Sequence, residues 1–118
     1  MVFRAWNKGD KLVKNQHMYF LQPNPEKELV LPEILIVPLI AFNEDCHRLG
    51  YGGGYYDRTI DNLKSVHKKA ILTIGVAFEV MKYDNSEDGL PEFETLDTDE
   101  ALDYIVTESN IYCGNTQI

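Results

Sequence analysis

Glycines are concentrated at one point of this chain. Four of the eight lie within positions 50–54, inside the segment RLGYGGGYYDR at 48–58. The apolar run ILIVPLI at 34–40 comes shortly before this segment, and a helical pattern follows it. A strand, a glycine loop and a helix in this order favour phosphate binding, because glycine lets successive N–H groups turn toward one anion and the helix N-terminus adds positive potential.

The glycine spacing fits neither standard nucleotide-binding template. A P-loop requires GxxxxGK[ST], and no Lys follows these glycines; Gly50, Gly52 and Gly54 form GxGxG rather than the dinucleotide-binding GxGxxG. The residues therefore indicate an anion site without saying which anion it binds. A glycine turn that only joins a strand to a helix is the structural alternative.

Hydrophobic periodicity predicts an α/β fold for this chain. It places strands at 2–6, 34–37, 70–78 and 104–107 and a helix at 55–65, with a turn at 7–10 and an extended connection at 21–31. The continuously apolar strand 34–37 is predicted to be central and buried on both faces. Strand, helix and strand with short links predict a right-handed βαβ unit with a parallel sheet.

The parallel sheet also predicts where a ligand binds. Ligands of open α/β sheets lie at the carboxyl ends of the strands, so the segments 41–55 and 78–81 are expected to form two walls of one crevice. A chain of 118 residues is long enough for one domain, predicted here as 1–118.

The charge distribution argues against nucleic-acid binding. The net charge is −8; all eleven Lys and Arg residues lie between Arg4 and Lys82, while 84–103 holds nine acidic residues and no basic one. Phosphate backbones are repelled by such a surface. The acidic stretch is either a solvated loop or a source of one or two carboxylates that face a bound cation.

Cysteine spacing and hydropathy indicate a cytoplasmic protein without a membrane partner. Cys46 and Cys113 stand 67 positions apart and have no partners at metal-site spacing, so free thiols are expected. Pro32, Glu33 and Pro38 interrupt the longest near-apolar run, 29–42, which rules it out as a membrane span. No signal-peptide pattern is expected at the N-terminus.

Two motifs carry a resemblance to a known family. The stretch that starts at Ile34 and runs through Asp57 and Arg58, ILIVPLIAFNEDCHRLGYGGGYYDR, resembles the signature of the 5-formyltetrahydrofolate cyclo-ligases, also called methenyltetrahydrofolate synthetases. In that family an apolar strand with a VPG-like end leads through A-F-D to RLGxGxGYYDR. The segment Leu102–Glu108 resembles the family's closing strand, D-x-x-x-D-x-I-V-T-E. The resemblance implies a three-layer α/β/α fold with a mainly parallel central sheet, truncated at the N-terminus.

The chain departs from the family pattern in two respects. Leu39 stands where the family usually has Gly after Val-Pro, which is expected to tighten or re-aim that turn. The resemblance also covers only the C-terminal portion of the family. The missing N-terminal region, which in the family supplies basic residues to the nucleotide phosphates and an acidic residue to the folate, has no recognisable counterpart in 1–33.

The resemblance implies an ATP- and Mg²⁺-dependent conversion of 5-formyltetrahydrofolate to 5,10-methenyltetrahydrofolate, with release of ADP and phosphate. This chemistry needs positioning and charge neutralisation rather than a protein nucleophile, in agreement with the absence of a Ser-His or Cys-His motif. Two alternatives stay open. The first is an inactive homologue that binds nucleotide or folate without turnover. The second is an interaction module that self-associates through an exposed sheet edge. The expected partners are the folate substrate and either a second copy or a separately encoded N-terminal piece.

The resemblance also assigns the site residues. It implies that Arg48, Tyr55 and Asp57 take part in catalysis and that Asp57 and Asp99 bind Mg²⁺, with Asp97 as a competitor for the second position. The ATP-binding residues would be Arg48, Leu49, Gly50, Tyr51, Gly52, Gly53, Gly54, Tyr55 and Tyr56, and the folate would lie against 51–55.

The residues alone leave the roles of several side chains open. Asp57 either interacts with the helix dipole or binds a metal. Arg58 either contacts phosphate or pairs with Asp61 or Asp57. Of the other candidates, Tyr56, Trp6 and Met18 are predicted to be core residues, and His47 and His67 surface residues.

Overall fold

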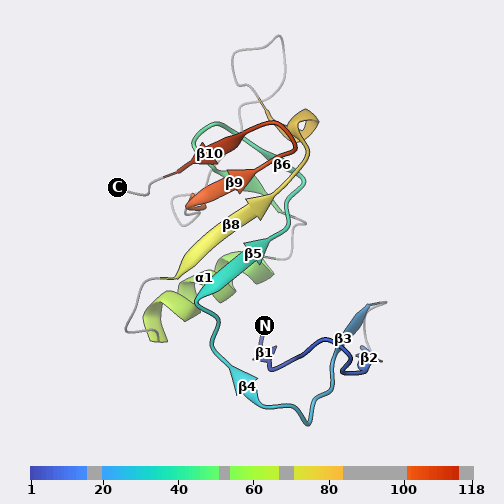
Figure 1. The fold of residues 1–118 in the computed structure, drawn as a ribbon. Coiled ribbons are helices and arrows are strands. Elements are labelled where there is room, and N and C mark those ends of the chain that lie inside the picture. The colour runs from blue at the N-terminus through green and yellow to red at the C-terminus, as the bar shows by residue number, and fades with distance from the viewer. Residues whose placement is uncertain (16–19, 51–53, 67–70, 84–100, 115–118) are drawn as a thin grey trace. The chain divides into compact units, whose positions relative to one another are not determined.

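The computed structural model describes residues 1–15, 20–50, 54–66, 71–83 and 101–114 (Figure 1). It consists of two compact units, Met1–Pro32 and Glu33–Ile118, which are described separately below. The single domain expected for 1–118 stays a prediction. No helix in the described part is long and apolar enough to cross a membrane.

The first unit is built from two short antiparallel ribbons. Strand β1 (Phe3–Arg4) pairs with β4 (Leu29–Val30), and β2 (Leu12–Lys14) pairs with β3 (Leu21–Pro23). The strand predicted at 2–6 is therefore shorter than expected, and the connection predicted at 21–31 contains two strands. Pairing with distant segments creates these strands, and two- and three-residue runs are too short to show a period in the sequence.

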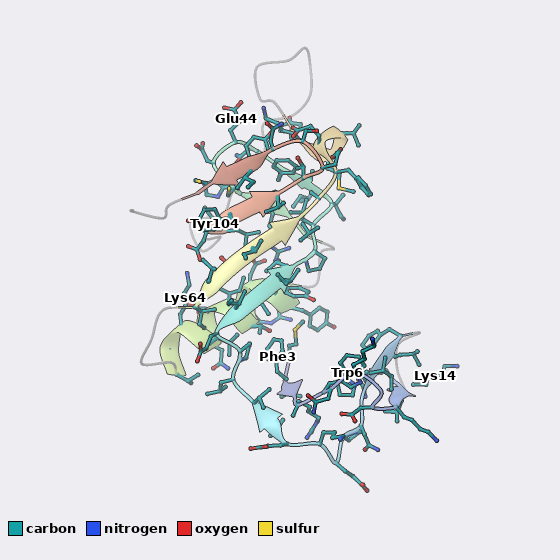
Figure 2. All side chains as sticks on the ribbon, viewed as in Figure 1. Phe3, Trp6, Lys14, Glu44, Lys64 and Tyr104 are labelled. Carbon is teal, nitrogen blue, oxygen red and sulfur yellow. The ribbon has the colours of Figure 1, made fainter. Side chains whose placement is uncertain are left out.

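The turn at 7–10 is confirmed, but the core role of Trp6 is wrong. The Asp10 amide donates to the Asn7 carbonyl at 2.9 Å, and Gly9 has a φ of +97°. Trp6, labelled in Figure 2, is 46% exposed, and its indole N–H donates to the Asp10 carbonyl at 3.0 Å. The indole thus packs on the turn that follows it. Met18 lies outside the described residues.

The second unit is organised around a four-stranded mixed sheet, ordered β10-β9-β8-β5 (Figure 1). Strand β8 (Leu72–Val76) pairs in parallel with β5 (Ile34–Val37) and with β9 (Tyr104–Val106), while β10 (Ile111–Cys113) pairs antiparallel with β9. The predicted α/β class and parallel sheet are confirmed. The described strands are shorter than the predicted runs 70–78 and 104–107, and β10 was not predicted.

The prediction that 34–37 is a central strand buried on both faces is wrong. Within the described sheet β5 is an edge strand that pairs only with β8, and its burial alternates. Leu35 and Val37 are 4% and 0% exposed, whereas Ile34 and Ile36 are 57% and 55% exposed. A continuous apolar run shows that both faces suit burial, but it does not show what covers each face.

One helical layer covers one face of the sheet. Helix α1 (Tyr55–Val66) lies behind β5 and β8 in Figure 1 and matches the predicted helix 55–65 almost residue for residue. Ile60 and Leu63 on α1 are 6% and 2% exposed, as their spacing predicts. The described residues contain this one α-helix and a single 3₁₀ turn, η1 (Glu79–Met81).

The core leaves no room for a side chain at Gly75 on β8. A Cβ at this position would lie 2.8 Å from Leu102 Cδ1 and 3.0 Å from both Ile105 Cγ1 and Leu39 Cδ2. Leu39 is 3% exposed and packs here. Its side chain thus becomes part of the core.

Candidate functional site

A small hairpin brings the start of the glycine segment back to the end of β5. Strand β6 (Ala41–Phe42) pairs antiparallel with β7 (Arg48–Leu49), and the Ile40 amide donates to the Leu49 carbonyl at 2.8 Å. Asn43 shapes the turn, because its side-chain oxygen accepts from the amides of Asp45 and His47 at 3.1 Å each. The hairpin places Arg48 directly after the carboxyl end of β5.

Arg48 has a buried side chain that is held by several groups. The side chain is 6% exposed, and its Nη2 lies 3.2 Å from Asp57 Oδ1. Nη1 donates to the Pro38 carbonyl at 3.4 Å, and the guanidinium lies 5.7 Å from the centre of the Tyr56 ring. A buried guanidinium stays charged, so this end of β5 carries a fixed positive charge.

Asp57 has the position that both of its predicted roles require. It lies in the first turn of α1, where a carboxylate interacts favourably with the helix dipole, and its side chain is 41% exposed. The exposed part of the carboxylate is open to a cation, although Oδ1 is paired with Arg48. The described residues contain no group of three or more His, Cys, Asp or Glu side chains arranged for a metal. Asp97 and Asp99 lie outside the described residues.

Only the two ends of the glycine segment are described. Gly54 has a φ of +66°, a value that L-residues rarely adopt, and it stands directly before α1. A Cβ on Gly50 would lie 2.6 Å from Arg48 Nη1, so this glycine leaves room for the guanidinium. Tyr51, Gly52 and Gly53 lie outside the described residues.

The aromatic and basic residues at the start of α1 form a second contact. Arg58 lies over the Tyr55 ring at 5.3 Å from its centre, and Tyr55 is 52% exposed. Arg58 forms an ion pair with neither Asp57 nor Asp61, and its guanidinium contacts the Tyr55 ring instead. Tyr56 is half-buried beneath Arg48, close to its predicted core role, and Leu49 is 52% exposed.

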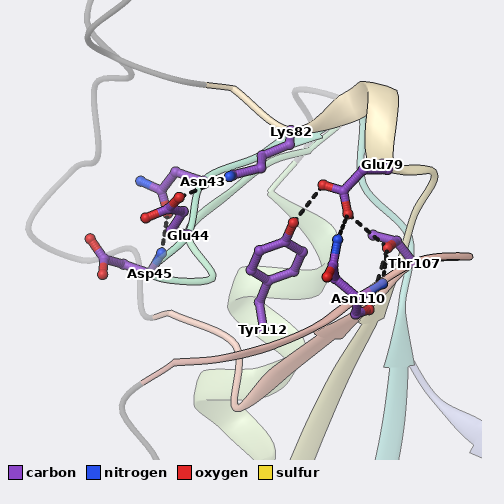
Figure 3. Close-up of polar contacts among 8 residues, drawn as sticks. All are labelled: Asn43, Glu44, Asp45, Glu79, Lys82, Thr107, Asn110 and Tyr112. Carbon is purple, nitrogen blue, oxygen red and sulfur yellow. Dashed lines mark hydrogen bonds and ion pairs between the residues drawn. The ribbon is translucent and has the colours of Figure 1, made fainter.

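The sequence interpretation missed a polar cluster at the carboxyl ends of β8 and β9 (Figure 3). Glu79 on η1 accepts hydrogen bonds from the side chains of Asn110 (2.8 Å), Thr107 (3.0 Å) and Tyr112, and these bonds, led by that from Asn110, lower its pKa. Its own amide donates to Glu108 Oε1 at 2.6 Å. These partners lie 28 to 33 positions away in sequence, beyond the reach of any local motif.

Two further residues adjoin the hairpin. Cys46 is fully buried with a φ of +65°, and burial raises the pKa of its thiol to about 11; both cysteines are free, as predicted. His47 is half-buried rather than a surface residue, and its Nδ1 is buried without a hydrogen-bond partner. His67 lies outside the described residues.

Comparison with known proteins identifies relatives of one kind. The sequence model of the 5-formyltetrahydrofolate cyclo-ligase family matches residues 4–108. The 5-formyltetrahydrofolate cyclo-ligase of Haemophilus influenzae is 34% identical over 80 residues, which cover 64% of this chain and 41% of that protein. The enzyme of the same name from Escherichia coli K12 is 39% identical over 66 residues, 52% of this chain and 36% of that protein.

A solved structure supports the same relationship. The structure of a 5,10-methenyltetrahydrofolate synthetase from Mycoplasma pneumoniae superposes with a TM-score of 0.51 and 27% identity, over 80% of this chain and 52% of that protein. The chain thus spans about half of that structure and less than half of the two bacterial sequences. Motifs, fold and relatives agree, and the chain belongs to the 5-formyltetrahydrofolate cyclo-ligase family.

Proposed function

We propose that this chain takes part in the ATP-dependent conversion of 5-formyltetrahydrofolate to 5,10-methenyltetrahydrofolate, with ATP phosphates at the glycine segment. The observation that supports this most is the buried Arg48 guanidinium, held against Asp57 where the glycine segment leaves β7. A fixed positive charge beside backbone amides suits the transferred phosphoryl group, whose negative charge must be neutralised in place.

The pair formed by Arg48 and Asp57 has a defined task in this proposal. Without ligand, Asp57 neutralises the guanidinium at 3.2 Å. When a nucleotide binds, some of the five N–H donors of Arg48 bind phosphate oxygens. The exposed oxygen of Asp57 stays directed toward solvent. The guanidinium then orients the phosphates while the half-buried Tyr56 ring beneath it limits its movement.

The donor set is compatible with Mg²⁺. Magnesium sites in nucleotide enzymes commonly use one or two carboxylates, with phosphates and water as the remaining ligands, so Asp57 with Asp99 or Asp97 would suffice. Bound there, the ion would supply additional charge neutralisation for the phosphates. Tyr55, half exposed at the helix start, and Tyr51 would border the folate.

A turnover assay tests the proposal directly. The chain is mixed with MgATP and 5-formyltetrahydrofolate, and the methenyl product is followed by its absorbance, with Asp57→Asn as the site variant and Asp61→Asn as a matched control on the exposed side of α1. Product formation that is lost in Asp57→Asn and kept in Asp61→Asn is expected. Thermal protection by MgATP without product would identify the inactive-homologue alternative, and the absence of both would refute the proposal.

The outer face of the sheet supports the proposal of a polypeptide partner. Its side chains, given by strand register, are uncharged and mostly apolar: Ile34, Ile36, Leu72, Ile74, Val76, Tyr104, Val106, Ile111 and Cys113. Ile36, Val76 and Ile111 are 55%, 54% and 69% exposed. Parallel sheets are normally covered by helices on both faces. We propose that a segment corresponding to the part of the relatives outside the match supplies this layer.

The mass of the protein in solution tests the partner. Light scattering on the chain alone is compared with the chain mixed with the H. influenzae segment that precedes the matched region. A monomer that gains the segment's mass is expected, and Ile36→Lys should abolish the complex while Val66→Lys, on α1, should not. A stable dimer of the chain alone that Ile36→Lys dissociates would instead identify a second copy as the partner.

A further inference from the structure

The turn that follows β8 exposes two large apolar side chains on either side of a fully engaged carboxylate. Phe78 and Val80 are 63% and 89% exposed, and Val80 is the most exposed large apolar residue of the described chain. Glu79 between them belongs to the cluster in Figure 3. Single exposed apolar residues are common, but two of them on a turn held this firmly need a physical reason.

The turn has little stability of its own. η1 is a three-residue 3₁₀ turn whose N-cap residue, Phe78, makes no side-chain capping bond. Such turns have poor hydrogen-bond geometry and rely on outside contacts. Glu79 provides them: its amide donates to Glu108, and its carboxylate accepts from Asn110, Thr107 and Tyr112. The conformation of the turn is therefore set by the β9–β10 segment.

Glu79 is suited to positioning and not to proton transfer. Both carboxylate oxygens already accept hydrogen bonds, Oε1 from Thr107 and Asn110 and Oε2 from Tyr112. A carboxylate with these donors stays ionised and acts as an acceptor only. Its neighbour Lys82 is engaged as well, at 2.8 Å from Glu44 Oε1 and over the Tyr112 ring.

The turn leaves the sheet beside the candidate phosphate site. In the β5–β8 ladder Val37 lies opposite Gly75, and neighbouring strands are separated by about 4.8 Å. Pro38, whose carbonyl accepts from Arg48, follows Val37, and Phe78 stands two positions after β8 ends at Val76. Lys82, which follows η1, forms a parallel bridge with Phe42, and Phe42 lies opposite Arg48 in the β6–β7 hairpin. Both segments, the one after β5 and the one after β8, follow the carboxyl ends of parallel strands, where ligands of such folds bind.

We propose that Phe78 and Val80 form an apolar ledge that contacts the aromatic rings of the folate substrate, and that Glu79 is the positioning residue that holds this ledge. The inference rests on the proposed function. Neither ledge side chain offers a hydrogen bond, so the ledge suits the faces of the pteridine and aminobenzoyl rings, while the phosphates of ATP need the charged and amide groups near Arg48.

Calorimetric titrations with 5-formyltetrahydrofolate and, separately, with ATP test the ledge. Phe78→Ala and Val80→Ala should each weaken folate binding about five- to ten-fold and leave ATP binding within about two-fold, as expected for the loss of a buried apolar contact. Val66→Ala, a half-exposed valine on α1, is the control and should change neither affinity. Unchanged folate affinity in both ledge variants overturns the inference, and an equal loss of ATP affinity assigns the ledge to the nucleotide.

Glu79→Gln separates positioning from a purely structural role, with Glu33→Gln, an exposed glutamate of the same unit, as the control. It should weaken folate binding as the ledge variants do and speed amide exchange in 79–82. Faster exchange with an unchanged ratio of folate to ATP affinity would make Glu79 structural only. If the wild-type protein does not bind 5-formyltetrahydrofolate, the ledge is refuted. If it binds the folate without turnover, the proposed activity is refuted, and these titrations still decide whether the ledge contacts the folate.

Discussion

Removing either partner of the ion pair between Arg48 and Asp57 should destabilise the chain by unequal amounts. Arg48 is 6% exposed and Asp57 is 41% exposed, so the two groups left behind differ in their access to water. In Asp57→Asn the guanidinium stays charged and buried, with the Pro38 carbonyl at 3.4 Å as its remaining backbone contact. In Arg48→Met the aspartate is left with water at its exposed side, and Met fills the volume of the arginine stem.

The size of this asymmetry follows from the burial. Breaking a fully buried pair costs about 3–5 kcal/mol and breaking an exposed pair about 0–1 kcal/mol. We expect about 2–4 kcal/mol for Asp57→Asn, which includes the loss of a favourable helix-dipole interaction of about 0.3–1 kcal/mol. Arg48→Met should cost about 1 kcal/mol, because the aspartate that remains is solvated.

Urea unfolding at neutral pH measures both values and completes a double-mutant cycle. In the Arg48→Met background, Asp57→Asn should cost only the helix-dipole contribution, which gives a coupling energy of about 1–3 kcal/mol. Asp61→Asn, on the exposed side of α1, should change stability by less than about 0.5 kcal/mol. Two results would contradict this reasoning: a loss of unfolding free energy in Arg48→Met as large as that in Asp57→Asn, or additive losses in the double variant. Either would show that Asp57 does not compensate the buried charge of Arg48.

Four further predictions concern packing, cysteine reactivity and titration. Gly75→Ala should destabilise by about 1–3 kcal/mol in the same assay, because its Cβ would lie 2.8 Å from Leu102 Cδ1; a change below about 0.5 kcal/mol would contradict this packing. Near neutral pH a thiol reagent should modify Cys113 quickly and the buried Cys46 only on unfolding. The pKa of Cys46 rises from 9.0 to about 11 on folding, so the native state binds more protons than the unfolded state between pH 9 and 11. The free energy of unfolding should therefore fall as the pH rises through this range, and it should fall less in Cys46→Ala. The Glu79 pKa is lowered from 4.5, so its contribution is present above 4.5 and lost as pH falls through the folded value; Glu79→Gln should remove this part of the acid unfolding profile.

The local sequence predicted the elements whose cause is local. The spacing of Tyr56, Ile60 and Leu63 predicted α1 to within one residue, and the glycines between an apolar strand and this helix placed the candidate site. The same segment carried the family resemblance that the matches confirm. Each of these signals lies in a continuous stretch, where side-chain period and backbone freedom determine the conformation.

Only the tertiary structure decided the features that depend on distant partners. Ile34 and Ile36 are exposed because they lie on the face of the sheet that α1 does not cover, and Arg48 is buried because a hairpin folds back on β5. The Glu79 cluster joins residues some thirty positions apart, of types that are found on any protein surface. A sequence specifies which faces are apolar and which turns are possible, whereas strand order and loop closure determine what covers a face and which polar groups meet, because these are settled by packing across the whole sheet.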